Sequence, residues 1–287
     1  MYKIFVTVRN RLSCTTKFIT ALRKHSVLEH QLYVYDNCTN HKIKEHFMYF
    51  SLLYEKGYIT QYTVNTKEST FNAFSKAVAF NQFLLNHEQD PNKDKCEFLV
   101  CLDNDIIVTP GWDRIIRDAW LDVKKYKMNN VKVIGQLPGG IKSKTVVNEK
   151  IAGIKGNKIG KLGGSGFWTM LPTFAKDVGY LDVKNLVGFN KKHDQHYWTK
   201  LEKSTNGKDY ILGLNYKLCI HVGSIAGSVC NVLTKNKNLK QRNPEELIKF
   251  EEAENKLDSM NFDEFYKMII NNKEMINNWW IKKWQKP

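Results

Sequence analysis

Two aspartates, Asp103 and Asp105, directly follow a nearly uninterrupted apolar run, residues 97–102. Residues two apart in a strand point to the same side, so both carboxylates can act on one site. Carboxylate oxygens suit hard divalent cations such as Mg²⁺ and Mn²⁺, which keep open positions for phosphate oxygens. The triplet therefore predicts a site for a cation and a diphosphate, although two acids at a strand end also occur as turn formers or helix caps.

Strand and helix patterns alternate before these aspartates. Strand patterns cover residues 3–8, 31–35, 58–64 and 97–102, and helix patterns cover residues 16–24 and 69–85. This alternation predicts an open α/β sheet with right-handed crossovers, in which ligands collect beyond the carboxyl ends of the strands. We therefore expect the residues at the carboxyl ends of the strands to line one cleft, namely Thr7, Arg9, Asp36 and residues 103–105.

Over about residues 1–225 the chain resembles the GT-A glycosyltransferases, especially the inverting family 2 type. The resemblance is carried, in order, by residues 7–11, Asp36, and residues 103–105, 163–168, 193–194 and 220–223. It implies an α/β fold of the GT-A, Rossmann-like kind, with an open, twisted, mainly parallel sheet flanked by helices. We expect a catalytic domain at residues 1–230, made of a nucleotide-sugar half (1–105) and an acceptor half (106–230). A helix-patterned tail predicts a C-terminal helical extension at residues 231–287.

The resemblance also implies roles for individual residues. Thr7 and Arg9 would lie along the nucleotide, and Asp36 would accept a hydrogen bond from the base, which favours uridine. Asp103 would approach the ribose or the sugar of a UDP-sugar donor, and Asp105 would bind Mn²⁺ or Mg²⁺. The plain alternatives are a helix cap for Asp36 and a surface charge for Arg9.

His221 and a glycine-rich segment, residues 163–168, complete the implied donor site. His221 would finish the metal site or touch the diphosphate, although its apolar neighbours fit a core histidine equally well. Gly164 would let the backbone approach the ligand, and Trp168 would offer a flat face to a sugar or base. The alternative for this segment is a glycine-rich turn that leads into a core strand.

Asp194 is the predicted general base, again by resemblance. Where the family usually has a Glu-Asp pair, this chain has His193 and Asp194. An inverting enzyme needs one base to take the proton of the acceptor hydroxyl as it attacks the anomeric carbon. His193 and His196 are the alternative bases.

The acceptor is suggested only by charge. The formal net charge is +15, and residues 123–163 contain ten lysines but one acid, Glu149. Such a segment is either a solvated face or an anion-binding surface beside the acceptor entrance. The acceptor could then be hydroxymethylated viral DNA with a flipped base, a cell-surface or lipid-linked glycan, or a protein side chain. A non-enzymatic, basic nucleic-acid-binding module is the alternative of a different class.

The remaining composition is that of a globular protein with 42% hydrophobic residues. The six cysteines form no C-x-x-C pair and several stand in apolar runs, which predicts buried thiols in a reducing compartment. No apolar run approaches the ~18 residues of a membrane span. We expect a soluble cytoplasmic protein, in the host cytoplasm for a viral one, with no integral membrane segment.

Overall fold

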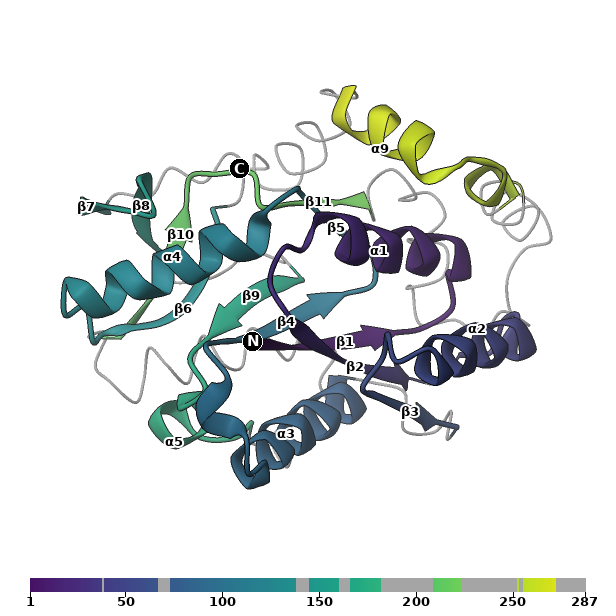
Figure 1. Cartoon of the computed structure of the whole chain (residues 1–287), viewed down its shortest axis with the longest axis horizontal. Coiled ribbons are helices and arrows are strands. Elements are labelled where there is room, and N and C mark those ends of the chain that lie inside the picture. Colours follow the sequence, from purple (N-terminus) through teal and green to yellow (C-terminus); the bar gives the residue numbers. More distant parts are fainter. Residues whose placement is uncertain are drawn as a thin grey trace, which may run out of the picture.

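Nine strands form one sheet in the part of the chain that the computed structural model describes, which is residues 1–37, 39–66, 73–137, 145–159, 166–181, 209–222, 252 and 255–271 (Figure 1). The strands are β1 (Tyr2–Val8), β2 (His30–Asn37), β3 (Gln61–Asn65), β4 (Leu99–Asp103), β6 (Val131–Gln136), β7 (Thr145–Ile151), β8 (Ile154–Ile159), β9 (Phe167–Met170) and β10 (Tyr210–Leu214). Their order across the sheet is β3-β2-β1-β4-β9-β6-β10-β8-β7, and β9 and β8 run opposite to the rest. The predicted open, mainly parallel α/β sheet is confirmed.

Helices cover both faces of this sheet. They are α1 (Leu12–His25), α2 (Ile43–Glu55), α3 (Ala73–Gln89), α4 (Trp112–Lys125), α5 (Phe174–Val178) and α9 (Phe262–Asn271). Two short strands, β5 (Ile106–Val108) and β11 (Cys219–His221), pair antiparallel beside the main sheet. The six elements predicted before Asp103 are all present, with bounds that differ by at most four residues.

Alternating side chains of the central strands build two apolar cores. Ile4 and Val6 join the core under α1, α2, α4 and α9, whereas Phe5 joins the core under α3 and α5 (Figure 1). Phe18 and Leu22, one turn apart on α1, are buried in the first core, and burial of each such side chain contributes ~1.5–3 kcal/mol. The carboxyl ends of the strands therefore lie between two well-packed helical layers.

The C-terminal helix α9 packs on α1. Phe265 and Ile269 belong to the first core, and the Lys17 amine donates a hydrogen bond to the Met260 carbonyl. Lys24 forms an ion pair with Asp263 at 3.0 Å. The described part of the predicted extension thus shares the core of the sheet, while the tryptophan-rich residues 279–284 lie outside the described residues.

The cysteines behave as buried apolar groups. Cys14, Cys96, Cys101 and Cys219 are all buried, with no disulfide among these four. Burial raises the pKa of Cys96 to about 11 and that of Cys219 to about 12, so both remain protonated thiols at neutral pH. The prediction of buried thiols is confirmed for these four residues. Across the described part of the chain, every helix is too short or too polar to cross a bilayer.

The free energy of unfolding should depend on pH through His46. This residue is 1% exposed on α2, and neither of its ring nitrogens has a hydrogen-bond partner among the described residues. Burial lowers its pKa from 6.5 to about 4, because the neutral ring is the form that tolerates the apolar site. In the unfolded chain His46 is protonated below about pH 6.5, whereas in the folded chain it is protonated only below about pH 4.

We expect the free energy of unfolding to fall between pH 6.5 and pH 4 by about 1 to 3 kcal/mol on account of His46. Urea denaturation of the wild-type protein and of His46→Leu across this window measures the effect. The variant should lose this share of the pH dependence. Parallel curves for the two proteins would show that His46 does not titrate in this way.

Candidate active site

The ends of three parallel strands meet at one cleft. The strand register sets Thr7 of β1 beside Asp103 of β4, and Val8 beside Asp36 of β2. A cleft of about 190 Å³ opens there. It is lined by Thr7, Val8, Arg9, Asn10, Arg11, Asn37, Lys76, Asp103, Asn104 and Asp105. The structure thus brings together four of the residues that sequence reasoning had placed in one site, namely Thr7, Arg9, Asp103 and Asp105.

Asp103 closes strand β4 and faces helix α3. Its Oδ1 accepts a hydrogen bond from the Thr7 hydroxyl at 3.4 Å and forms an ion pair with the Lys76 amine. Its backbone N–H donates to the Gly166 carbonyl at 2.8 Å. A Cβ atom at position 166 would lie 2.6 Å from both Cβ and Cγ of Asp103. Glycine is therefore required at 166 for Asp103 to keep this position.

Asp105 reaches the same cleft by a turn. Strand β4 ends at Asp103, and Asn104 and Asp105 form the turn before β5, so strand alternation is not what sets the two carboxylates on one side. The buried Asn104 amide donates to the Thr15 hydroxyl on α1 at 2.8 Å, which holds the turn. Asp105 Oδ2 accepts a hydrogen bond from Arg11 Nη1 at 2.9 Å. The acids converge as predicted, but for a different geometric reason.

Two residues in left-handed conformation shape the loop between β1 and α1. Asn10 has φ 50° and Arg11 has φ 55°, a region that costs an L-residue roughly 1–2 kcal/mol. The Asn10 side chain offsets this cost by accepting hydrogen bonds from the backbone N–H groups of Asn40 and His41 at 2.9 and 3.1 Å. These hydrogen bonds join the loops after β1 and β2 and hold Arg9 and Arg11 at the cleft.

Asp36 shapes a turn in this structure. It is 2% exposed, and its carboxylate accepts hydrogen bonds from the Thr39 backbone N–H at 3.0 Å and the Tyr62 hydroxyl at 3.4 Å. Burial raises its pKa above the ordinary value, while these hydrogen bonds oppose the rise. Helix α2 begins only at Ile43, so Asp36 caps a turn and not the helix itself.

Trp168 is a core residue, contrary to the prediction that it binds the donor. It lies opposite Cys101 in the pairing of β9 with β4 and is 2% exposed. Its ring packs against Phe80 at 5.1 Å and against Phe174 at 6.2 Å between centroids. A ring enclosed in this way presents no face to a ligand, so the alternative, a turn leading into a core strand, describes Trp168 better.

Strand β11 carries position 221 to the turn that holds Asp105. His221 lies opposite Ile106 in the β5–β11 ladder, and the next backbone N–H, that of Val222, donates to the Asp105 carbonyl at 2.8 Å. The backbone of position 221 therefore lies next to the turn of Asp105, and a ligand role for His221 stays a prediction. The other predicted site residues, Gly164, His193, Asp194 and His196, lie outside the described residues.

The cleft suits an anion together with a divalent cation. Its described lining contains three cationic side chains, Arg9, Arg11 and Lys76, and two acids, an excess of one positive charge. No three His, Cys, Asp or Glu side chains of the described residues form a complete metal site. Mg²⁺-type cations nevertheless bind through one or two carboxylates and complete their shell with phosphate oxygens and water. Asp103 and Asp105 fit that requirement.

Lys76 is a site residue that sequence reasoning missed. It is the single charged residue in the predicted helix at 69–85, and it projects from α3 to Asp103. A lone cation on an otherwise apolar and neutral helix was the available signal. Its partner became apparent only when α3 and β4 were placed side by side.

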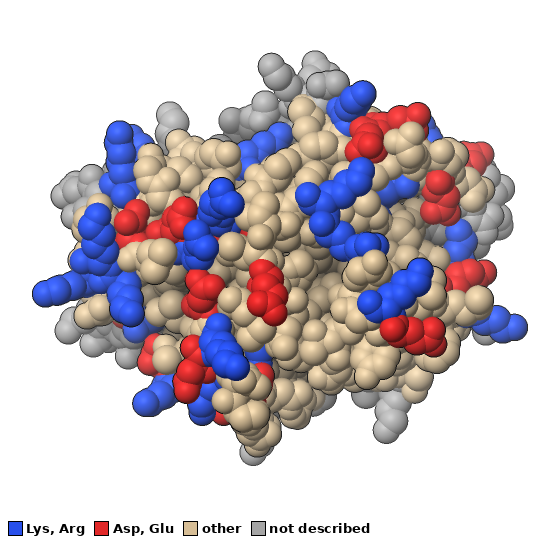
Figure 2. Space-filling model, viewed as in Figure 1, with Lys and Arg blue, Asp and Glu red and all other residues tan. Residues whose placement is uncertain are grey.

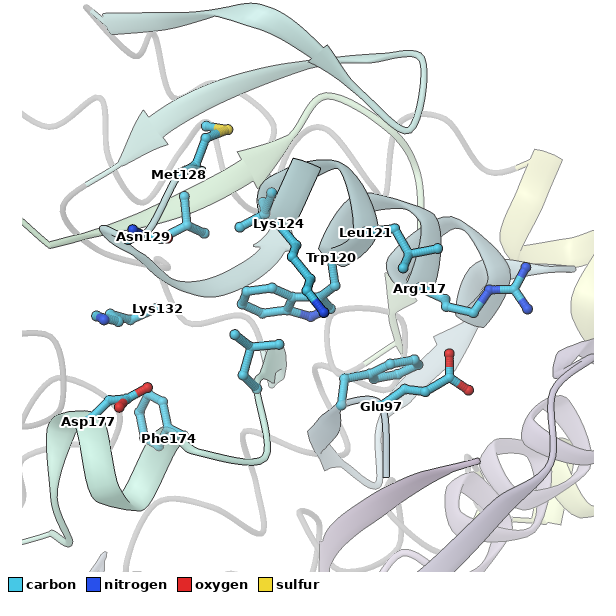
Figure 3. A pocket seen from close by; sticks show the side chains of 14 residues that line it. Glu97, Arg117, Trp120, Leu121, Lys124, Met128, Asn129, Lys132, Phe174 and Asp177 are labelled. Atoms are coloured by element: carbon cyan, nitrogen blue, oxygen red, sulfur yellow. The ribbon is translucent and has the colours of Figure 1, made fainter. Parts of the chain in front are cut away.

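A larger cavity, of about 470 Å³, lies at the opposite end of the strands, at their amino ends (Figure 3). Trp120, Leu121 and Met128 line it together with Lys124 and Lys132, near the amino ends of β4 and β6. The lysines on its wall are thus far from Asp103 along the strand direction. These two lysines therefore do not line the cleft that contains Asp103 and Asp105.

The structure describes only some of the remaining lysines of that segment. Lys142, Lys144 and Lys161 lie outside the described residues. On the face shown in Figure 2, lysines and arginines are interspersed with aspartates and glutamates. The described surface therefore presents no uniform track for a polyanion on this face.

Comparison with known proteins relies on structure alone, because no family model and no curated protein matches the sequence. A solved structure of GalNAc-T7 with UDP, GalNAc and Mn²⁺ is similar at 9% identity and a TM-score of 0.53, covering 99% of this chain and 56% of that one. The mannosyltransferase PcManGT from Pyrobaculum calidifontis, in complex with GDP-Man and Mn²⁺, is similar at 14% identity and a TM-score of 0.50, covering 90% and 70%.

The chain has the GT-A fold. A structure of S. aureus TarS is also similar, at 13% identity and a TM-score of 0.47, over 87% of this chain. This GT-A chain spans 42% of that TarS chain and 56% of GalNAc-T7, so it corresponds to part of each. At such identities the likeness establishes the fold, and the chemistry must be inferred from the cleft.

Proposed function

We propose that this GT-A chain is a metal-dependent glycosyltransferase that transfers a sugar from a UDP-sugar to an acceptor hydroxyl with inversion. The observation that carries the proposal is the cleft at the strand ends, where Asp103 and Asp105 stand among three cations. An excess of positive charge around two carboxylates suits a diphosphate bound with a divalent cation. The similar GalNAc-T7 and PcManGT structures contain a nucleotide or nucleotide-sugar and Mn²⁺, which supports the same class of donor here.

The residues of the cleft divide the work of binding. Thr7 and Arg9 lie along the nucleotide, and Asp103 approaches the ribose or sugar, while Asp36 holds the turn after β2 beside the cleft. Asp105 would hold Mn²⁺ or Mg²⁺ together with His221 and a shared oxygen of Asp103, and the cation would supply charge stabilisation for the leaving diphosphate. By the resemblance, Gly164 would let the backbone approach the donor. The protein's contribution is alignment of donor and acceptor, since a single inverting displacement needs no covalent intermediate.

Asp194 is the proposed base that removes the proton of the acceptor hydroxyl. We expect Asp194→Asn to keep Mn²⁺-dependent UDP binding and to lose transfer by at least about 100-fold, because general base catalysis contributes ~10²–10⁴. Titration with UDP and measurement of transfer to the acceptor separate the two effects. His193→Gln and His196→Gln are the matched controls: normal transfer by Asp194→Asn, with loss in either histidine variant, would move the base to that histidine.

The experiment that tests the activity measures release of UDP. The purified protein is incubated with Mn²⁺ and a panel of nucleotide-sugars, with and without hydroxymethylated DNA. Mn²⁺-dependent release supports the proposed transferase. Absence of metal-dependent UDP binding and release with every donor would favour the basic nucleic-acid-binding module.

A glycan is the acceptor class we propose first. The DNA alternative depended on lysines at the acceptor entrance, and two of the described ones, Lys124 and Lys132, line the cavity at the amino ends of β4 and β6. DNA-stimulated release of UDP in the experiment above would reverse this choice.

A further inference from the structure

Both acids of the Asp-x-Asp triplet are paired with cations of the chain itself. Asp103 Oδ1 forms an ion pair with Lys76 Nζ from α3, and Asp105 Oδ2 lies 2.9 Å from Arg11 Nη1 at the start of α1. The side chains of Lys76, Arg11 and Asp105 are only 15%, 12% and 10% exposed, and that of Asp103 is 36% exposed. The pairs are therefore shielded from full solvent screening, and each carboxylate holds a strong partner from a different helical layer.

These pairs compete with a divalent cation for the same oxygens. A hard cation binds carboxylate oxygens at ~2.0–2.1 Å, and an ammonium or guanidinium group on the same carboxylate would be repelled at that distance. The described lining already has an excess of one positive charge. A divalent cation entering alone would add two more positive charges to a small, partly enclosed cleft.

We propose that Lys76 and Arg11 are exchangeable counter-ions. In the donor-free protein they neutralise Asp103 and Asp105. When a divalent cation takes the two carboxylates, Lys76 and Arg11 turn to the oxygens of the diphosphate that arrives with it. This inference rests on the proposed function and adds to it a coupling between the metal and the nucleotide.

The charge balance explains why the two ligands should bind together. The cation alone must displace two ion pairs and raise the positive charge, whereas the diphosphate supplies new partners for both displaced side chains. Each ligand therefore tightens the other by the same factor, since coupling between binding equilibria is reciprocal. Weak binding of Mn²⁺ alone and tight binding with UDP are the expected behaviour.

Lys76→Met tests the exchange because it keeps the length of the stem and removes the charge. Mn²⁺ binding is measured by electron paramagnetic resonance without nucleotide, and UDP binding by calorimetry at saturating Mn²⁺. We expect Mn²⁺ alone to bind about tenfold more tightly to the variant, and UDP about tenfold more weakly, so that the coupling between them shrinks. Arg11→Met, at the second pair, should change both affinities in the same directions.

Lys132→Met, on the wall of the cavity at the amino ends of the strands, is the control and should leave both affinities unchanged. Thermal denaturation shows that each variant is folded, and Lys76→Gln repeats the test if Lys76→Met is not. If UDP binding requires Mn²⁺ but the charge-removing variants at Lys76 and Arg11 match the wild type, the counter-ion exchange is wrong and the transferase proposal stands. If the wild type binds no UDP at any Mn²⁺ concentration, both fail.

Discussion

Replacing Asp105 by asparagine is expected to weaken Mn²⁺-dependent UDP binding by at least about 100-fold, since even indirect supports of a metal site change affinity by 10–100-fold. Asparagine keeps the shape of the side chain but removes the charge that a hard cation needs. Metal-free UDP binding should stay the same or tighten, because the Arg11 guanidinium loses its carboxylate partner. Calorimetric titration of UDP with and without Mn²⁺ measures both effects.

The matched control for this variant is Asp118→Asn. Asp118 is an acid on α4 with a side chain 45% exposed, and it pairs with Arg117 outside the cleft. It tests whether loss of one negative charge anywhere on the protein alters UDP binding. Retention of full Mn²⁺ dependence by Asp105→Asn would remove Asp105 from the metal site and leave the cation binding elsewhere.

Gly166→Ala is expected to have the second large effect, on stability and binding together. The new Cβ would lie 2.6 Å from the Asp103 Cβ, an atom that is fixed by the backbone and cannot rotate aside. The chain must move at a point where the Asp103 N–H is bonded to the Gly166 carbonyl. Overpacking of this kind costs ~1–3 kcal/mol of stability, and UDP binding should weaken because Asp103 no longer keeps its position at the cleft.

Urea denaturation and UDP titration at saturating Mn²⁺ measure the two effects of Gly166→Ala. Gly156→Ala is the matched control. Gly156 is on strand β8, outside the residues that line the cleft, and its new Cβ would meet only the end of the Leu212 side chain, at 2.8 Å. It should lose less stability and bind UDP normally. Equal UDP affinity in Gly166→Ala and the wild type would mean that the position of Asp103 does not govern donor binding.

The structure separates most of the predicted site residues into three parts. Thr7, Arg9, Asp103 and Asp105 lie together at the cleft, and Trp168 lies in the core. The third part, with Gly164 and Asp194, is outside the described residues, so its role stays a prediction. The part found at the cleft comes from the carboxyl ends of strands and the residues just after them, where the position of a residue depends mainly on its strand.

Sequence alone determined the local elements and the edge of the sheet where chemistry would collect. Apolar periodicity identifies strands and helices because burial of one face is a local property, and the carboxyl end of each strand then follows from chain direction. The Asp-x-Asp triplet stands at such an end in β4, and four cysteines in apolar surroundings are buried as predicted. These conclusions need no knowledge of which strands are neighbours.

Only the tertiary structure decided the partners of the charged groups and the burial of Trp168. Lys76 and Arg11 meet Asp103 and Asp105 because α3 and α1 cover opposite faces of β4, and that arrangement is set by strand order. A flat aromatic residue after a glycine-rich segment has the same sequence pattern whether it faces a ligand or a core. Ion pairs and long-range packing join residues distant in the chain, so no local pattern of spacing could specify them.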